Sequence, residues 1–285
     1  MYKSFWALTE KIAIHETAFV TSAFRASNRT LSKDPYAQLW PTEKTTVHAQ
    51  HYASSVSDYE PFAHCLRNRF FFEILNNLVT KNKIEILINF GCGFSMYPFL
   101  LPKKLVHIEI DKSNVIDYKK GKIQSFQSNG FIPLREVHYI AADFNRDGEA
   151  ELLSEIKKIK NGRPSFILIE GVLFFISGGD SKRLFSLFDK IQGTNEFIGS
   201  VSFRKSLEET EVFKKMIRFI EGNLDKNAQF GYQTVDDDFY QNLEHYSLID
   251  HQDTLKLSET YAPDKSIITD EVLNEHMYVL KKQKK

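Results

Sequence analysis

The chain has 285 residues, of which 42% are hydrophobic and 26% are charged, a composition that argues against an intrinsically disordered protein. Lysine plus arginine and aspartate plus glutamate both number 37, so the chain lacks the basic excess of most nucleic-acid-binding domains. We therefore expect no nucleic-acid partner, and the length is ample for one large α/β domain.

Cysteine content and the chain start bear on the compartment. Cys65 and Cys92 are too few for a disulfide scaffold in a chain of this length, which predicts a reducing compartment. The first residues include Glu10 and Glu16 and no long apolar core, unlike a signal peptide. No apolar run of about 18 residues occurs, so no membrane span or membrane partner is expected. These features predict a cytoplasmic protein and leave its oligomeric state open.

The predicted elements begin with an irregular helical segment. Residues 1–60 show no strand-like alternation, and Asp34-Pro35 is a turn signal within them. A helix follows around residues 66–78, where apolar side chains recur at helical spacing. Apolar runs then alternate with helical segments. Strands are predicted at 84–89, 104–110, 137–141, 165–170 and 196–203, and helices at 114–126, 149–160, 180–191 and 207–221.

The order of these elements predicts the fold class. Near-continuous apolar strands that alternate with helices are typical of a parallel sheet covered on both faces. Two further strands, at 245–252 and 275–282, have no long helix between them and are expected to form an antiparallel edge. We therefore predict an α/β fold with a doubly wound, mostly parallel sheet. A single domain is expected, with residues 1–60 as an N-terminal helical lid on a sheet core at 61–285.

Glycines or carboxylates follow each of the first four predicted strands. Gly91 and Gly93 follow the first strand, Asp111 the second, Asp143 the third and Glu170 the fourth. In an open parallel sheet, ligands bind beyond the carboxyl ends of the strands. Asp111 also comes about 20 residues after the glycine turn, an offset at which a carboxylate can bind ribose hydroxyls. The pattern therefore favours a cofactor that contains a nucleoside.

The glycine turn itself narrows the choice of cofactor. Met96 stands where a dinucleotide fold places its third glycine, which disfavours a nucleotide-binding oxidoreductase. No Lys-Ser or Lys-Thr follows at the spacing of a phosphate-binding loop. A cofactor with an adenosine but no phosphates needs a glycine turn, a ribose carboxylate and an aspartate near the adenine. These requirements favour S-adenosylmethionine.

Six segments within residues 17–180 carry a resemblance to a known family, and they read TSAFRASNRTLSKDPYAQLW, LRNRFFFEIL, ILINFGCGFSMYPF, HIEIDKSNVIDYKKGKI, YIAADF and FILIEGVLFFIS. In these segments and in their order, the chain resembles the leucine carboxyl methyltransferase family, including its bacterial branch that methylates polyketide carboxyl groups. The resemblance implies a class I S-adenosylmethionine-dependent methyltransferase with a Rossmann-like sheet of seven strands, the last of them antiparallel.

Carried over residue by residue, the resemblance implies a set of cofactor contacts. Where the family continues its glycine turn with Asp-Thr and then Arg, this chain has Ser95, Met96 and Tyr97, which puts the substrate end of the pocket in question. The implied contacts are Gly91 under the methionine part with Gly93 in the same turn, Asp111 at the ribose, Asp143 and Phe144 at the adenine, Glu170 after the fourth strand, Arg67 at the methionine carboxylate, and Arg25 near the family's N-terminal basic contact.

The reaction type implied by the family is transfer of a methyl group to a carboxylate. A carboxylate is ionised at pH 7 and needs no general base, but positive or hydrogen-bonding groups must hold it. Arg204, directly after the fifth predicted strand, is the candidate for that role, and Tyr97 is a second pocket candidate. Phe174, Phe175 and Phe203 also lie near strand ends, where an apolar pocket would suit a ring or an acyl chain.

We expect the acceptor to be a small organic acid. A protein C-terminal carboxylate is the alternative acceptor, since part of the family acts on one, and an inactive methyltransferase-like binding module is the alternative to an enzyme. No metal site is expected, because His48 and His51 lie three residues apart but no third ligand accompanies them.

Overall fold

The computed structural model describes residues 17–144, 148–223 and 231–284. These residues form one seven-stranded sheet with the strand order β3-β2-β1-β4-β5-β7-β6. The first five strands are parallel, and β7 runs antiparallel between β5 and β6. The predicted fold class and the antiparallel last strand are confirmed. The strands are β1 (Ile86–Phe90), β2 (Val106–Asp111), β3 (His138–Ala141), β4 (Ser165–Ile169), β5 (Phe197–Ser202), β6 (Tyr246–Asp253) and β7 (His276–Lys282).

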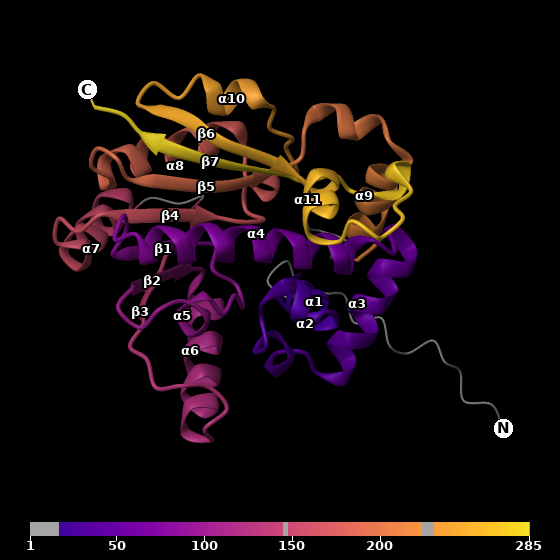
Figure 1. Ribbon diagram of the computed structural model, residues 1–285, viewed down its shortest axis with the longest axis horizontal. Helices are drawn as coiled ribbons and strands as arrows, with labels where there is room; N and C mark the ends of the chain where they lie inside the picture. Colours follow the sequence, from indigo (N-terminus) through magenta and orange to yellow (C-terminus); the bar gives the residue numbers. More distant parts are fainter. Residues whose placement is uncertain (1–16, 145–147, 224–230, 285) are drawn as a thin grey trace.

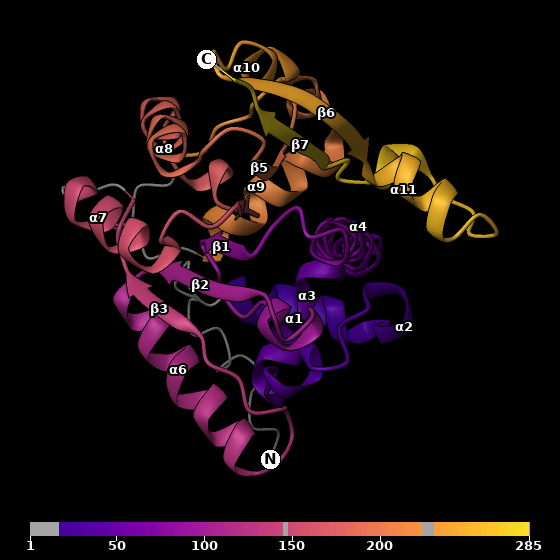
Figure 2. The ribbon, with the colours of Figure 1, turned by 60° about the vertical axis from the view of Figure 1, so that its left-hand side comes forward.

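Helices cover both faces of this sheet (Figure 1). Alternate side chains of the central strands pack on α7, α8 and α10 on one face, and on α4 and α11 on the other. Figure 2 shows α4 on the opposite side of the sheet from α7 and α8. The larger helices are α1 (Thr17–Ser27), α3 (Glu43–Val56), α4 (Glu60–Thr80), α6 (Ser113–Ser128), α7 (Glu149–Lys160), α8 (Gly178–Ile191), α9 (Glu211–Asn223) and α11 (Thr254–Tyr261). The short helical turns are α2 (Arg29–Ser32), η2 (Ala37–Leu39), α5 (Tyr97–Leu100), η3 (Leu173–Phe175), η4 (Lys205–Glu209), α10 (Asp237–Gln241) and η5 (Thr269–Glu271).

One predicted helix differs in its bounds. The sequence predicts a continuous helix over residues 207–221, whereas the structure has the 3-10 turn η4 and then α9, which begins at Glu211. The break has a local cause, because the Thr210 hydroxyl accepts a hydrogen bond from the backbone N–H of Phe213 at 3.3 Å. A threonine in this position caps a new helix and so ends the preceding turn.

The N-terminal helices pack on α4 and reach the glycine turn. The predicted turn at Asp34 is present, and the buried Asp34 carboxylate accepts hydrogen bonds from the backbone of Tyr36 and Ala37 at 3.1 and 2.9 Å. Trp40 stacks on Phe94, in the glycine turn, with ring centroids 4.5 Å apart. This segment therefore lies against the site predicted from the sequence. Its role as a lid remains a prediction, and residues 1–16 of the predicted lid lie outside the described residues.

The helices also bear on membrane association. Among the residues that the structure describes, no helix combines the length and the apolar character needed to cross a bilayer.

Candidate functional site

The glycine turn after β1 lies where the strand order reverses. Gly91 and Gly93 have φ angles of 69° and 42°, a left-handed conformation that suits glycine. The backbone N–H groups of Gly91 and Cys92 donate to the Ile110 carbonyl of β2, at 2.8 and 3.1 Å. A Cβ atom on Gly91 would lie 2.1 Å from Cγ2 of Val172, in the turn after β4. The turns after β1 and β4 are thus in contact at the switch point where ligands bind to such sheets.

A buried ion pair lies next to this turn and contacts its backbone. Lys119 of α6 pairs with Glu109 of β2, and both side chains are at most 1% exposed. The Lys119 ammonium also lies 3.4 Å from the Cys92 carbonyl oxygen, inside the glycine turn. Burying both charges is tolerable because each one neutralises the other. Sequence reasoning missed this pair, because the segment HIEIDKSNVIDYKKGKI contains both residues but does not show that their side chains meet.

Asp111 ends β2 beside the glycine turn, as predicted. Its carboxylate accepts hydrogen bonds from the backbone N–H of Gly93 and of Lys112, each at 2.8 Å. Burial raises the pKa of Asp111 above its ordinary value, and these two N–H groups oppose that shift. A carboxylate oxygen has more than one lone pair, so the group still has capacity to accept further hydrogen bonds. Its contact with a ribose remains a prediction.

Asp143 and Phe144 follow β3 and line a cavity of about 320 Å³. Leu152 of α7 and Leu187 of α8 complete its apolar wall, and Arg183 of α8 donates to the Phe144 carbonyl oxygen. The Phe144 ring lies 5.6 Å from the ring of Phe90, at the end of β1. Glu149, Glu151 and Glu155 also line it, so the cavity combines apolar walls with several carboxylates. An adenine ring remains the ligand predicted for Asp143 and Phe144.

Glu170, Arg67 and Tyr97 form a buried cluster at the carboxyl end of β4. The Tyr97 hydroxyl donates to the two Glu170 carboxylate oxygens at 3.3 and 3.2 Å, and Nε of Arg67 lies 3.7 Å from Glu170 Oε1. Nη1 of Arg67 donates to both carboxylate oxygens of Glu275, at 2.7 and 2.9 Å. Burial raises the pKa of Glu170, and the Arg67 charge opposes that shift. Sequence reasoning missed Glu275, because a lone glutamate before a strand carries no signal.

The N-terminal end of α4 adds two more polar side chains, Glu60 and His64, to this cluster. Glu60, His64 and Arg67 lie one helical turn apart along α4, and His64 Nε2 is 3.8 Å from a Glu60 oxygen. Burial and the nearby Glu275 carboxylate raise the pKa of Glu60 to about 8. Burial and the Arg67 charge lower the pKa of His64, so its ring is neutral. The spacing of these residues was visible in the sequence, but their burial was not.

The buried side chain of Arg25 links α1 to the glycine turn. Its Nε atom donates to Asp34 at 3.1 Å and its Nη2 atom donates to the Phe94 carbonyl oxygen at 2.9 Å. The side chain of Arg25 is 8% exposed and that of Asp34 is fully buried. The structure therefore gives Arg25 an internal role in joining the N-terminal helices to the turn, and its contact with a cofactor stays a prediction.

Arg204 follows β5 as predicted, and its contacts are with Asp237 and His251. Its guanidinium binds Asp237 of α10 through two hydrogen bonds, of 2.9 and 2.5 Å, and the side chain is 32% exposed. The Tyr278 hydroxyl donates to the same carboxylate at 2.6 Å. His251 Nε2 lies 3.4 Å from Nη2 of Arg204. An acceptor carboxylate that binds Arg204 must share it with Asp237, a competitor that the sequence did not reveal.

The aromatic residues predicted near the acceptor are only partly brought together. Phe174 packs on Phe175 and Phe203, with ring centroids 5.1 and 5.6 Å away, and stacks on Tyr232 at 5.5 Å. Leu207 and residues of α9 complete this apolar cluster beyond β4 and β5. Tyr97 lies elsewhere, in the core beneath Glu170. The cluster therefore provides an aromatic wall without Tyr97.

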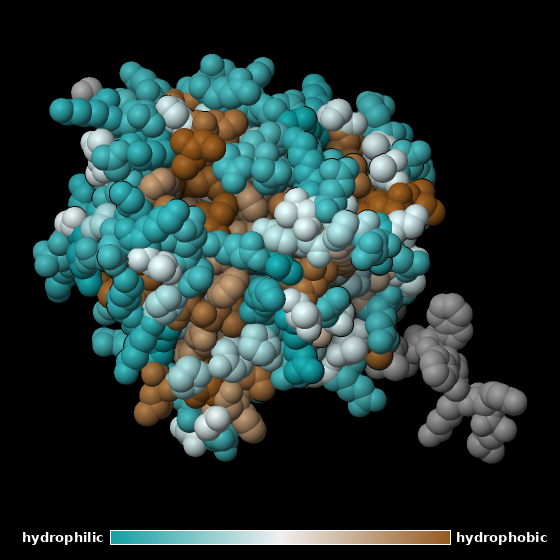
Figure 3. Space-filling view, viewed as in Figure 1, coloured by the Kyte–Doolittle hydropathy of each residue, from teal (hydrophilic) through white to brown (hydrophobic). Residues whose placement is uncertain are grey.

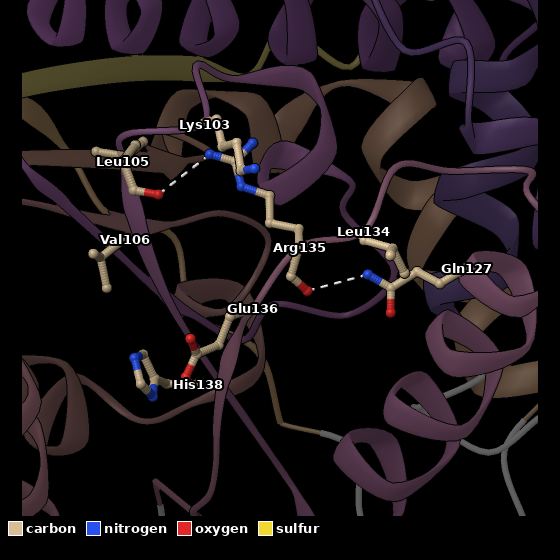
Figure 4. Close-up of a pocket in the computed structure, with 8 residues that line it drawn as sticks. All are labelled: Lys103, Leu105, Val106, Gln127, Leu134, Arg135, Glu136 and His138. Atoms are coloured by element: carbon tan, nitrogen blue, oxygen red, sulfur yellow. Dashed lines mark hydrogen bonds between the residues drawn. The ribbon is translucent and has the colours of Figure 1, made fainter.

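A larger cavity, of about 490 Å³, lies at the amino ends of the parallel strands, away from the glycine turn (Figure 4). It is lined by Lys103, Val106 and His138 near the starts of β2 and β3. Arg135 does not project freely into it, because its guanidinium donates to the backbone carbonyls of Leu101 and Leu105 at 2.7 and 3.3 Å. Figure 3 shows apolar surface over the lower end of α6, near this edge. None of the predicted site residues lines this cavity, so its size does not make it the functional site.

The two histidines considered as metal ligands lie on an aromatic ring. His48 and His51 have ring centroids 5.6 and 5.3 Å from that of Phe219. Within residues 17–144, 148–223 and 231–284, no three His, Cys, Asp or Glu side chains are grouped as a metal ion would require.

Comparison with known proteins agrees with this geometry. The family model described as leucine carboxyl methyltransferase matches residues 15–189, more than half of the chain. The chain belongs to the leucine carboxyl methyltransferase family. A protein of Mycobacterium bovis (strain BCG / Pasteur 1173P2), named as a proposed S-adenosyl-L-methionine-dependent methyltransferase, is 24% identical over 219 residues, which are 70% of this chain and 67% of that protein. A Mycobacterium ulcerans (strain Agy99) relative with the same description is 28% identical over 122 residues, 43% of this chain and 38% of its own.

Solved structures share the fold of this methyltransferase. A proposed methyltransferase from Thermobifida fusca has a TM-score of 0.66 and 13% identity, with 99% of this chain and all of that one covered. Magnesium protoporphyrin IX methyltransferase from Synechocystis, solved with S-adenosylhomocysteine, has a TM-score of 0.51 and 8% identity, with 93% of this chain and all of that one covered. The protein is therefore a class I methyltransferase, and its cofactor is S-adenosylmethionine.

The residues at the switch point fit this cofactor. The glycine turn lets backbone approach closely, and Asp111 supplies a hydrogen-bond acceptor beside it. Arg67 and Glu170 place a cation and a carboxylate 3.7 Å apart, which matches the carboxylate and the ammonium of an amino-acid group.

Proposed function

We propose that this methyltransferase transfers a methyl group to a carboxylate oxygen of a small organic acid and so forms a methyl ester. The observation that carries the proposal is the aromatic wall of Phe174, Phe203 and Tyr232 beyond β4 and β5. It begins four residues after Glu170, which we expect to bind the amino-acid end of the cofactor. Such a wall suits the ring or the acyl chain of an organic acid.

The cofactor, when bound, supplies an electrophilic methyl carbon attached to a sulfonium. The chain's own residues then have to align the acceptor oxygen and exclude water. No general base is required for an acceptor that is already ionised at neutral pH. Arg204 would hold the acceptor carboxylate in place of one of its contacts with Asp237, and the aromatic wall would keep water from the reacting atoms. The 32% exposure of the Arg204 side chain leaves room for this exchange.

The acceptor is tested with S-adenosylmethionine that carries a labelled methyl group. The protein is incubated with two separate pools, one of small organic acids and one of cell protein. Label that enters the small-acid pool and is released by mild base supports the proposal, because esters hydrolyse under these conditions. Asp111→Ala protein serves as the control for label that does not depend on the cofactor site.

Three other outcomes contradict the proposal. Base-labile label confined to the protein pool identifies a protein carboxylate as the acceptor. Base-stable label in either pool excludes ester formation and indicates transfer to nitrogen, carbon or a hydroxyl oxygen. Tight binding of S-adenosylhomocysteine with no label in either pool favours a binding module without activity.

A further inference from the structure

The Arg67–Glu275 pair joins two distant parts of the chain at the cofactor site. Arg67 lies on α4, and Glu275 lies in the turn just before β7, 208 residues away. Nη1 of Arg67 donates to the two Glu275 oxygens at 2.7 and 2.9 Å, and each side chain is 10% exposed. Glu275 also lies beyond residues 15–189, the part of the chain that matches the family model. The C-terminal strand pair therefore contributes a charged group to this site.

A second carboxylate competes for the same guanidinium. Nε of Arg67 is 3.7 Å from Glu170 Oε1, which is within ion-pair range but longer than the contacts to Glu275. In the described part of the chain, both hydrogen bonds of Arg67 leave from Nη1. A guanidinium has five N–H donors in a rigid plane, so holding Nη1 fixes the direction of Nε and Nη2 as well. Without Glu275, the attraction of Glu170 would be unopposed.

We propose that Glu275 is a positioning residue for the amino-acid end of the cofactor. It holds Arg67 so that the guanidinium does not form a direct hydrogen-bonded ion pair with Glu170. Glu170 thereby stays available for the cofactor's ammonium, and Nη2 of Arg67 stays available for the cofactor's carboxylate. The proposal rests on the S-adenosylmethionine cofactor and on the predicted contacts of Arg67 and Glu170, and it is independent of the acceptor.

The test is Glu275→Gln, which keeps the size of the side chain and removes its charge. Binding of two ligands is measured by calorimetry. S-adenosylhomocysteine carries the amino-acid end, whereas 5′-methylthioadenosine shares the adenosine and lacks that end. We expect affinity for S-adenosylhomocysteine to fall by about tenfold or more, the effect of misplacing charged hydrogen bonds. Affinity for 5′-methylthioadenosine should stay within about twofold, because this ligand lacks the amino-acid end that Arg67 and Glu170 are expected to bind.

Glu271→Gln is the matched control. Glu271 carries the same side chain four residues earlier and is exposed. Both ligands should bind this variant as they bind the unmodified protein. If Glu275→Gln weakens the binding of both ligands equally, Glu275 has only a structural role. If the affinity for neither ligand changes, Glu275 does not position Arg67. If Glu275→Gln does not fold, Glu275→Asp keeps the charge, and the same preferential loss of S-adenosylhomocysteine is expected with a smaller magnitude.

A double variant tests competition with Glu170 directly. Glu170→Gln by itself should weaken S-adenosylhomocysteine binding, because it removes the carboxylate expected to take the ammonium. In the Glu170→Gln background, Glu275→Gln should weaken binding by a smaller factor than in the unmodified protein, because the Glu170 carboxylate that would attract Arg67 is gone. Equal factors in both backgrounds would overturn the proposed competition.

Discussion

Gly91→Ala is expected to destabilise the protein through two separable effects. The first is backbone strain, because Gly91 has a φ angle of 69°, where a residue with a Cβ atom costs about 1–2 kcal/mol. The second is steric, because the new Cβ atom would lie 2.1 Å from Cγ2 of Val172. Forcing an extra carbon into a packed site typically costs about 1–3 kcal/mol. The two effects together predict a loss of about 2–5 kcal/mol in the free energy of unfolding.

Two variants separate these effects. Gly171 has a φ angle of 64°, but a Cβ atom there would meet nothing within 4 Å, so Gly171→Ala should show only the strain of about 1–2 kcal/mol. Val172→Ala removes Cγ2 and leaves the Cβ of residue 172 at an ordinary contact distance of 3.6 Å. That change alone should cost about 1 kcal/mol, because Val172 is half-buried.

The assay is equilibrium unfolding in urea of the four proteins in the cycle and of Gly171→Ala. The double variant Gly91→Ala/Val172→Ala should be more stable than the sum of its single changes predicts, by about 1–3 kcal/mol, because the steric effect is relieved. If Gly91→Ala costs no more than Gly171→Ala, the contact with Val172 contributes nothing to the cost. If the costs of the two single changes simply add, the new Cβ atom does not clash with Cγ2 of Val172.

The remaining predictions concern the cofactor, the pH dependence, the acceptor and the lid. Asp111→Ala should weaken S-adenosylhomocysteine binding in calorimetry by about 1–3 kcal/mol, since it removes the acceptor beside the glycine turn, and unchanged affinity would contradict the ribose role. Burial and the Glu275 charge raise the pKa of Glu60 from 4.5 to about 8, so the folded state keeps a proton that the unfolded chain releases, and stability falls as pH rises across that window. Between pH 5.5 and 7.5 the unmodified protein should therefore lose about 1–3 kcal/mol more stability in urea unfolding than Glu60→Gln, and parallel losses would contradict this. Arg204→Ala should raise the KM for the acceptor and lower the rate while the affinity for S-adenosylhomocysteine is kept. A loss of that affinity would indicate that Arg204 binds the cofactor and not the acceptor. Limited proteolysis before residue 60 should slow when S-adenosylhomocysteine is added, and equal cleavage with and without it would count against the lid.

Much of the sheet was predictable because its strands carry their own signal. The predicted strand at 165–170 and the observed β4, Ser165–Ile169, differ by one residue, since every side chain of that strand is buried and therefore apolar or small. The predicted strands at 245–252 and 275–282 also lie within one residue of the observed β6, Tyr246–Asp253, and β7, His276–Lys282. The sequence predicted an antiparallel edge, but only the structure shows that β7 inserts between β5 and β6.

The residues at the carboxyl ends of the strands could be identified from local patterns alone. Parallel strands end at one edge, so the glycine turn and the carboxylates of Asp111 and Glu170 had to meet there once the strands were recognised. Which charges pair around them depends on contacts between distant parts of the chain. A buried Arg67 requires a carboxylate because an isolated charge is costly in the interior, but local sequence does not say which one. The choice of Glu275 follows from β7 lying beside β5, which brings a residue 208 positions away to within 2.7 Å of the arginine.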